Sequence, residues 1–99
     1  MSSDEPLDRT LHAIADPTRR RILVALKQGK TSEAKAVSGC LCGGDIEERI
    51  HLSQPTISHH MAILTKAGLV QARKQGQWRW YRRNEKAIRQ VVKNLRGKL

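Results

Sequence analysis

The apolar pattern of this chain changes its period at Gly68. Before that residue, Ile57, Met61 and Leu64 recur every three or four positions, the spacing that puts side chains on one face of an α-helix. After it, apolar and polar side chains alternate on both sides of Gly76, the two-residue period of β-strands. We therefore expect an amphipathic helix that ends near residue 67 and a β-hairpin over about 69–83.

A second, shorter helix precedes this amphipathic helix. Asp45 is a suitable N-cap for it, and Ile46 and Ile50 lie on one face. Ser53 follows at once as the cap of the longer helix. Two short helices joined by a tight corner, over about 45–67, predict a helix-turn-helix, and the basic hairpin directly after it predicts a wing.

The remaining segments predict three more helices. An apolar stripe precedes Asp16-Pro17, where Asp16 is expected to cap a second helix that ends at Gly29. Another stripe predicts a last helix over about 84–96. Because 99 residues suit one domain, we expect residues 1–99 to form a single, mainly α domain with a small β-hairpin, in the order helix, helix, helix, helix, strand, strand, helix. The insertion at Lys30–Gly39 is unexplained by this pattern.

The positive charge is concentrated in the second half of the chain. The net charge is +10, and residues 51–99 carry eleven basic side chains against Glu85 alone. Such asymmetry favours a polyanionic partner, usually nucleic acid, although a solubility surface would show the same excess. No apolar run is long enough for a membrane span and the N-terminus is unlike a secretory signal, so we expect a cytoplasmic protein without a membrane partner.

Four segments together resemble the ArsR/SmtB family of winged-helix repressors. They are Ala15-Asp-Pro-Thr-Arg-Arg-Arg-Ile-Leu23, Leu52-Ser-Gln-Pro-Thr-Ile-Ser-His-His-Met61, Ala67-Gly-Leu-Val70, and the wing with Gly76 and Tyr81. The resemblance implies a homodimer, paired through its first and last helices, that binds an operator in double-stranded DNA and represses transcription. In many members of the family an inducer, often a metal ion, releases the DNA.

The apolar stripes of the first and last helices independently favour the same dimer. A small winged core leaves such stripes exposed, and exposed apolar patches mark association sites. A two-fold dimer would present its recognition helices to half-sites about one helical turn apart, which predicts a palindromic operator. The expected interface residues are Leu7, Leu11, Ile14, Ile88, Val91, Val92 and Leu95.

Two sets of side chains are candidates for DNA contact. Gln54, Thr56, Ser58 and His59 lie near the start of the predicted recognition helix, where base edges are read. On the wing, we expect Arg73, Lys74, Gln75, Gln77 and Arg79 to meet the backbone or the minor groove. The three consecutive arginines Arg19, Arg20 and Arg21 could add a phosphate contact, or each arginine could be a solvated surface charge.

Neighbouring residues are expected to have structural roles. His60 should face inward and make an internal hydrogen bond. Trp78, Trp80 and Tyr81 could stack on single-stranded bases, but packing of the hairpin against the helices explains them more simply.

Cys40 and Cys42 are the candidate sensing residues. In an extended, glycine-flanked segment their side chains point the same way, and a nearby helix N-terminus would lower a thiol pKa. Cys42, three residues before Asp45, matches a family cysteine position, whereas Gly44 occupies the second such position. The hypotheses are release by a soft ion such as As(III), Sb(III) or Cd(II), oxidation or persulfide chemistry, and no sensing. Two thiols are too few for a closed tetrahedral metal site, which needs four ligands. A three-coordinate site of the As(III) type would need a third donor from elsewhere.

A sequence-specific repressor is the leading hypothesis among the classes of function. A non-specific nucleic-acid-binding protein and a small metal-binding protein are the alternatives. We expect no enzyme, because the sequence has no glycine-rich phosphate loop, no His-x-x-x-His pair and no plausible catalytic carboxylate pair.

Overall fold

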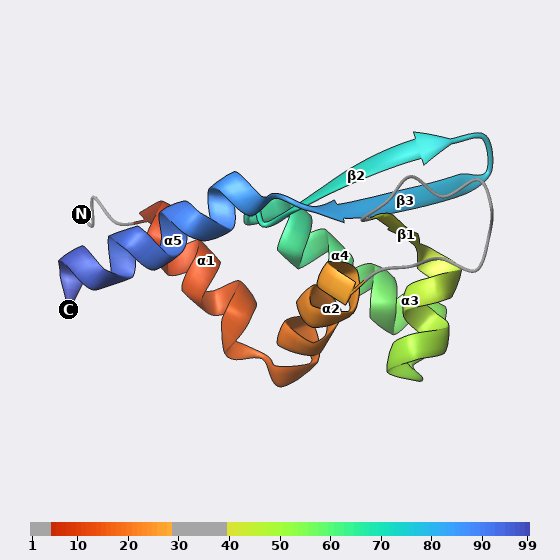
Figure 1. The fold of residues 1–99 in the computed structure, drawn as a ribbon. Helices are drawn as coiled ribbons and strands as arrows, with labels where there is room; N and C mark the ends of the chain where they lie inside the picture. The colour runs from red at the N-terminus through yellow and green to blue at the C-terminus, as the bar shows by residue number, and fades with distance from the viewer. Residues whose placement is uncertain (1–4, 29–39) are drawn as a thin grey trace.

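The computed structural model describes residues 5–28 and 40–99 (Figure 1). The described elements, in chain order, are α1 (Glu5–Ala15), α2 (Pro17–Gln28), β1 (Cys40–Cys42), α3 (Gly43–Ile50), α4 (Gln54–Lys66), β2 (Val70–Gln75), β3 (Trp78–Arg83) and α5 (Glu85–Lys98). This order confirms the winged helix-turn-helix expected from the sequence and adds one strand, β1. The insertion Lys30–Gly39 and the expected helix end at Gly29 lie outside the described residues.

The three strands form an antiparallel sheet in the order β1-β3-β2. The long β2–β3 hairpin extends beyond the helices, and β1 pairs with the side of β3 that the hairpin leaves open (Figure 1). Leu41 of β1 lies opposite Tyr81, and both side chains are buried. β1 therefore joins the wing to the hydrophobic core.

The core lies between the sheet and helices α2, α3 and α4. Its largest fully buried side chains come from every one of these elements except β3: Ile22, Leu26, Leu41, Ile46, Met61, Leu64, Leu69 and Val70. The buried stripe of α4 is the Ile57, Met61 and Leu64 set that the sequence predicts. This packing leaves the opposite side of α4 in solvent.

The corner between α1 and α2 is held from both sides. Asp16 caps α2 as predicted, because its Oδ1 accepts hydrogen bonds from the backbone N–H groups of Thr18 (2.7 Å) and Arg19 (3.2 Å). The Arg19 side chain is buried, and its Nε donates to the carbonyl of Ala13 at 2.7 Å. The Arg20 guanidinium donates to the carbonyl of Ile14 at 2.6 Å. Two arginines thus satisfy carbonyls at the end of α1.

The start of α3 corrects one expectation. The helix begins at Gly43 with Cys42 as its N-cap, so Asp45 is the third helical residue and not the cap. The Asp45 carboxylate accepts a hydrogen bond from the Cys42 backbone N–H at 3.2 Å. At the other end, His51 adopts a left-handed conformation with φ of 62° and makes the tight corner to α4.

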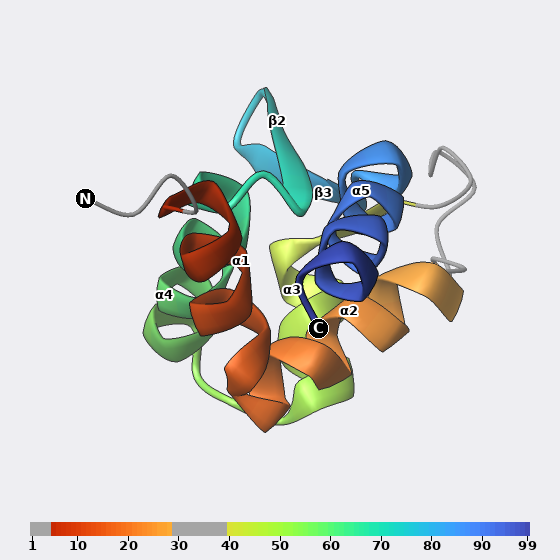
Figure 2. The same ribbon diagram turned by 90° about the vertical axis from the view of Figure 1, so that its left-hand side faces the viewer.

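Asn84 is the N-cap of helix α5, and its Oδ1 accepts a hydrogen bond from the Ala87 N–H at 3.1 Å. The helix contacts α1 at one end of the molecule (Figure 1), and Figure 2 shows that the two helices diverge from each other. None of its residues, all of which the structure describes, is buried, and Val92 is 54% exposed. Ile88 and Val91 pack partly against the core. No helix among residues 5–28 and 40–99 has both the length and the apolar character needed to cross a membrane.

Candidate nucleic-acid interface

The exposed side of α4 carries the predicted base-reading residues. Gln54, Thr56, Ser58 and His59 are all exposed. Ser53 is the N-cap, as predicted, but its hydroxyl lies 3.0 Å from that of Thr56 and makes no capping bond to a backbone amide of the described chain. Backbone N–H groups in the first turn of α4 therefore have no side-chain cap, and helix N-termini with free donors bind phosphate.

A shallow groove joins α4 to the wing. Its lining includes Gln54 and Ser58 from the helix together with Lys74, Gln77 and Arg79 from the hairpin. A second hollow continues along α4 and joins Ser58 and Arg79 to Lys66. Five of the predicted contact residues, widely separated in sequence, thus share one surface.

The remaining predicted contact residues lie outside this groove. Thr56 and His59 are exposed elsewhere on α4, outside the residues that line the groove. Arg73 and Gln75 line a cavity on the other face of the hairpin, with Cys40 and Trp80. Neighbouring strand residues point to opposite faces, so the wing cannot present Arg73 and Lys74 to the same surface.

Sequence reasoning did not select Lys66, although the helical spacing already put it on the outer side of α4 with Ala62.

The groove is basic but includes a carboxylate. Among the described residues, Lys74, Arg79 and Glu47 of α3 line the groove, and Lys66 adds a positive charge in the adjoining hollow. No ion pair joins these three cations to a carboxylate within the described ranges 5–28 and 40–99. Their charges are therefore available to a polyanion.

The three arginines at the start of α2 differ in their surroundings. Arg19 is buried and Arg20 is bonded to carbonyls at the end of α1, so these two side chains are part of the fold. A phosphate contact by Arg19 is therefore excluded by its burial. Arg20 and Arg21 are both exposed, but the Arg20 side chain is bonded to the end of α1.

The three aromatic residues of the wing differ in burial. Tyr81 is buried against the helices, as expected. Trp78 is 51% exposed but lines the groove with Gln54 and Tyr81, so it meets the expectation only in part. Trp80 is half-buried and lines the cavity on the outer face of the sheet, because it lies on the strand face opposite to that of Tyr81.

His60 does not make the predicted hydrogen bond. Its Nδ1 is buried and has no partner within the described part of the chain. Burial lowers the pKa of His60, opposed by the Asp16 carboxylate and reinforced by the Arg19 and His59 charges. The side chain thus lies against the α1–α2 corner in its neutral form at neutral pH.

The two cysteines have different surroundings. The Sγ of Cys42 donates a hydrogen bond to Oδ2 of Asp45 at 3.1 Å. Burial raises the pKa of this thiol, and the Asp45 carboxylate raises it further, so the expected lowering by the helix N-terminus is wrong for Cys42. Cys40 is half-buried and faces the outer side of the sheet. Over residues 5–28 and 40–99, no three His, Cys, Asp or Glu side chains are grouped so that they could hold a metal ion.

The helix-turn-helix, its exposed second helix and the adjoining basic wing define a winged helix-turn-helix DNA-binding protein. Comparison with known proteins specifies the family. The family described as "Bacterial regulatory protein, arsR family" matches residues 16–72. This chain belongs to the ArsR family and is a DNA-binding transcriptional regulator.

Individual relatives agree over nearly the whole length. A helix-turn-helix-type transcriptional regulator of Methanocaldococcus jannaschii is 37% identical over 93 residues, which cover 94% of each chain. An arsenical resistance operon repressor of Staphylococcus aureus is 34% identical, over 94% of this chain and 80% of the relative. The crystal structure of an ArsR family transcriptional regulator superposes with a TM-score of 0.78 over 98% of this chain and 89% of the other; at 22% identity, this match shows the shared fold.

Proposed function

We propose that this chain represses transcription as a homodimer that places α4 of each subunit in successive major grooves of a palindromic operator. The observation that carries the proposal is the groove shared by α4 and the wing, where Gln54 and Ser58 lie with Lys74 and Arg79. A helix in the major groove then brings the hairpin beside the neighbouring phosphates.

The contacts fall into two groups. Gln54, Thr56, Ser58 and His59 would read base edges, since glutamine can bond adenine through two hydrogen bonds and the hydroxyls can reach bases or phosphates. Lys74, Gln77 and Arg79 would contact the backbone or the minor groove. Arg73 faces away from this surface, so the orientation of the hairpin assigns it no direct place in the groove.

The exposed apolar stripe supports the dimer. Leu7, Leu11 and Ile14 on α1 are half-buried, as are Ile88, Val91 and Leu95 on α5, while Val92 is more than half exposed. Both helices lie at the end of the molecule opposite the wing tip, where α1 contacts α5 (Figure 1), and we infer that their stripes contribute to one interface there. Pairing through it would leave both copies of α4 free.

A footprint on the DNA upstream of its own reading frame tests this proposal. We expect protection of an inverted repeat at protein concentrations that leave bulk DNA unbound, with a native fragment competing far better than random duplex. Equal competition by random duplex would instead identify a non-specific nucleic-acid-binding protein. We propose no catalytic activity, and we place the regulator in the cytoplasm with the DNA.

Release by a soft ion such as As(III), Sb(III) or Cd(II) is a second proposal, supported by the arsenical resistance repressor among the relatives. The described residues fit it incompletely, because Cys42 is bonded to Asp45 and no three-donor group is present over 5–28 and 40–99. We therefore derive no binding step through Cys40 and Cys42. Titrating As(III), Cd(II) and an oxidant against the operator complex, with C40S and C42S variants, separates ion release from thiol oxidation. If neither treatment releases the DNA, the protein is a repressor without a thiol-directed inducer.

A further inference from the structure

The outer face of the three-stranded sheet carries a group of side chains outside the groove that α4 and the wing share. The strand register puts Cys40, Arg82 and Gln71 in one row across β1, β3 and β2. The next row brings Trp80 opposite Arg73. Directly opposed residues on one face have Cβ atoms about 5 Å apart, so both rows are within mutual reach.

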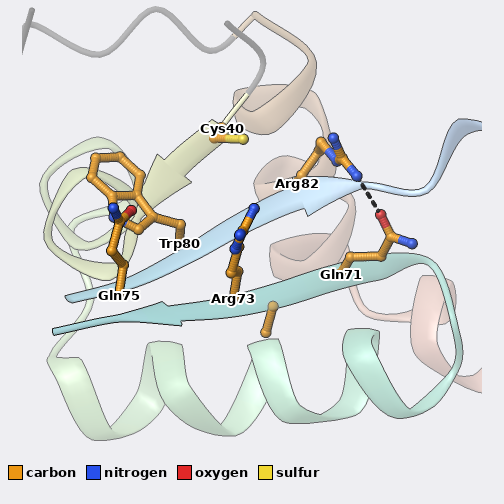
Figure 3. A pocket seen from close by; sticks show the side chains of 7 residues that line it. Cys40, Gln71, Arg73, Gln75, Trp80 and Arg82 are labelled. Atoms are coloured by element: carbon orange, nitrogen blue, oxygen red, sulfur yellow. Dashed lines mark hydrogen bonds between the residues drawn. The ribbon is translucent and has the colours of Figure 1, made fainter. Parts of the chain in front are cut away.

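These side chains surround a cavity of about 150 Å³ (Figure 3). The described residues that line it are Cys40, Gln71, Ala72, Arg73, Gln75, Trp80 and Arg82. Figure 3 shows the Arg73 side chain rising between Trp80 and the Arg82–Gln71 pair. A cavity of ~150 Å³ can accommodate one benzene-sized ring.

The charge in this cavity is unbalanced. Arg82 donates a hydrogen bond to the neutral Oε1 of Gln71 at 3.0 Å. Neither Arg73 nor Arg82 has a carboxylate partner in the part of the chain that the structure describes. Two guanidinium groups therefore share one small cavity with a thiol and an indole, and none of the described residues that line it is acidic.

Each lining group favours the same kind of ligand. Guanidinium groups bind carboxylates through paired hydrogen bonds, and the fork is planar. The indole of Trp80 offers an aromatic surface for a ring. The cavity thus has room for one ring, two positive charges and an aromatic surface. An anion with a single aromatic ring matches all three properties.

We propose that this outer-sheet pocket binds a small aromatic carboxylate of the benzoate class. The carboxylate lies between Arg73 and Arg82, and the ring lies against Trp80 with its edge toward Cys40. The proposal concerns the free protein and does not depend on the operator or on a metal.

Tryptophan fluorescence tests the proposal directly. The chain has two tryptophans, so in a W78F background Trp80 alone reports, and benzoate should change its emission saturably while neutral benzamide should not. Adding R73Q should weaken benzoate binding by about tenfold or more, because a charge-assisted hydrogen bond is lost. R89Q, which removes an exposed arginine from α5, is the matched control and should leave the affinity unchanged. Absence of saturable binding, or equal weakening by R73Q and R89Q, would overturn the proposal.

Alkylation of Cys40 gives a second readout without tryptophan. Iodoacetamide forms a bond between its methylene carbon and the Cys40 sulfur, iodide leaves, and the thiol proton goes to solvent. Bound benzoate should slow this reaction at Cys40, measured on the separated peptide by mass spectrometry, and benzamide should not. If benzoate and benzamide have the same effect, the pocket does not recognise the carboxylate.

Discussion

Arg19 is a charged side chain that is buried because backbone carbonyls satisfy its guanidinium. Its side chain is 7% exposed, and its guanidinium bonds the carbonyls of Ala13 and His12 near the end of α1. The distance to Asp16 Oδ2 is 4.0 Å, so the nearby carboxylate adds a weak ion pair. A positive group at a helix C-terminus also interacts favourably with the helix dipole.

We therefore expect R19A to destabilise the protein by about 2–4 kcal/mol, since it leaves buried carbonyls unpaired and removes packing. R21A changes an exposed arginine two residues away and should cost about 0.5 kcal/mol or less. Urea unfolding at one fixed protein concentration measures both, because association shifts apparent stability. Similar losses for the two variants would show that the bonds of Arg19 contribute little.

His60 predicts a pH dependence of stability. Burial lowers the pKa of this side chain below its ordinary value of 6.5, so the unfolded chain binds more protons than the folded chain when the pH falls below that value. The stability is complete above about pH 6.5 and declines as the pH falls through the lowered pKa of the folded state. The pKa of Asp16 is also lowered: burial opposes the charged form, but the N–H groups of Arg19 and Thr18 favour it. Its contribution to stability is therefore lost only at a pH below 3.8, separate from that of His60.

Unfolding free energies of wild type and H60N, measured from pH 7.5 to 5, test this. The wild type should lose stability over the lower part of the range, and H60N should lose less. H59N changes the exposed neighbour and is the matched control, with a wild-type slope expected. A slope in H60N equal to that of wild type would assign the pH dependence to another group.

At the scale of elements, the two strand faces of the wing allow a sharp test of the DNA interface. Arg73 and Arg79 are both exposed hairpin arginines, but Arg79 lines the groove with α4 whereas Arg73 lines the outer cavity. R79A should weaken binding to all duplexes and reduce the salt slope of log K by about 1 per subunit. R73A should have a much smaller effect on both.

Q54A on α4 should instead relax sequence choice, since a glutamine–adenine pair contributes about 1–3 kcal/mol of discrimination. Affinities of the three variants for operator and random duplex, at two salt concentrations, distinguish these outcomes. Equal losses for R73A and R79A would show that DNA approaches the other face of the wing. Equal losses for Q54A on both duplexes would remove α4 from sequence reading.

The helices with a repeated apolar spacing could be predicted from the sequence. The strand whose pairing partner is distant in sequence could not. The stripe Ile57, Met61 and Leu64 and the cap at Asp16 are local signals, and the structure confirms both. β1 has three residues and pairs with β3, so its flanking glycines are compatible with an extended segment but do not predict that it joins the sheet. Without β1, the outer face of the wing has no third strand, and the cavity around Arg82 could not be anticipated.

The sequence assigns the predicted DNA-contact residues to the correct helix and hairpin, but it does not say on which face of the hairpin each one lies. Alternation in the hairpin separates Arg73 from Lys74, yet the sequence does not say which face the helices cover. Tyr81 settles this, because it is buried while Trp78 and Trp80 are not. The change of Asp45 from expected cap to third helical residue has a similar cause, since the strand β1 sets where α3 can begin.

The whole molecule places its basic groove and its exposed apolar stripe on different elements. The basic groove lies at α4 and the wing, and the exposed stripe lies on α1 and α5 at the far end (Figure 1). A protein with this arrangement can associate and bind DNA at the same time, because the two surfaces do not compete. For a dimer with ~6–10 phosphate contacts, affinity should fall by ~10³–10⁵ between 50 and 200 mM salt.

Two valines of similar exposure test whether the stripe is the dimer surface. Val92 on α5 is 54% exposed and Val24 on α2 is 50% exposed, but only Val92 lies on the α1–α5 surface. V92E should produce a monomer, since a carboxylate in an apolar interface loses its hydration, and operator affinity should fall by more than tenfold because one subunit holds one half-site. V24E should remain a dimer with wild-type affinity. Both variants should keep the fold, because neither side chain is buried, and sedimentation equilibrium at micromolar concentration measures the mass. A V92E protein that still sediments as a dimer, or dissociation of V24E alone, would move the interface away from α5.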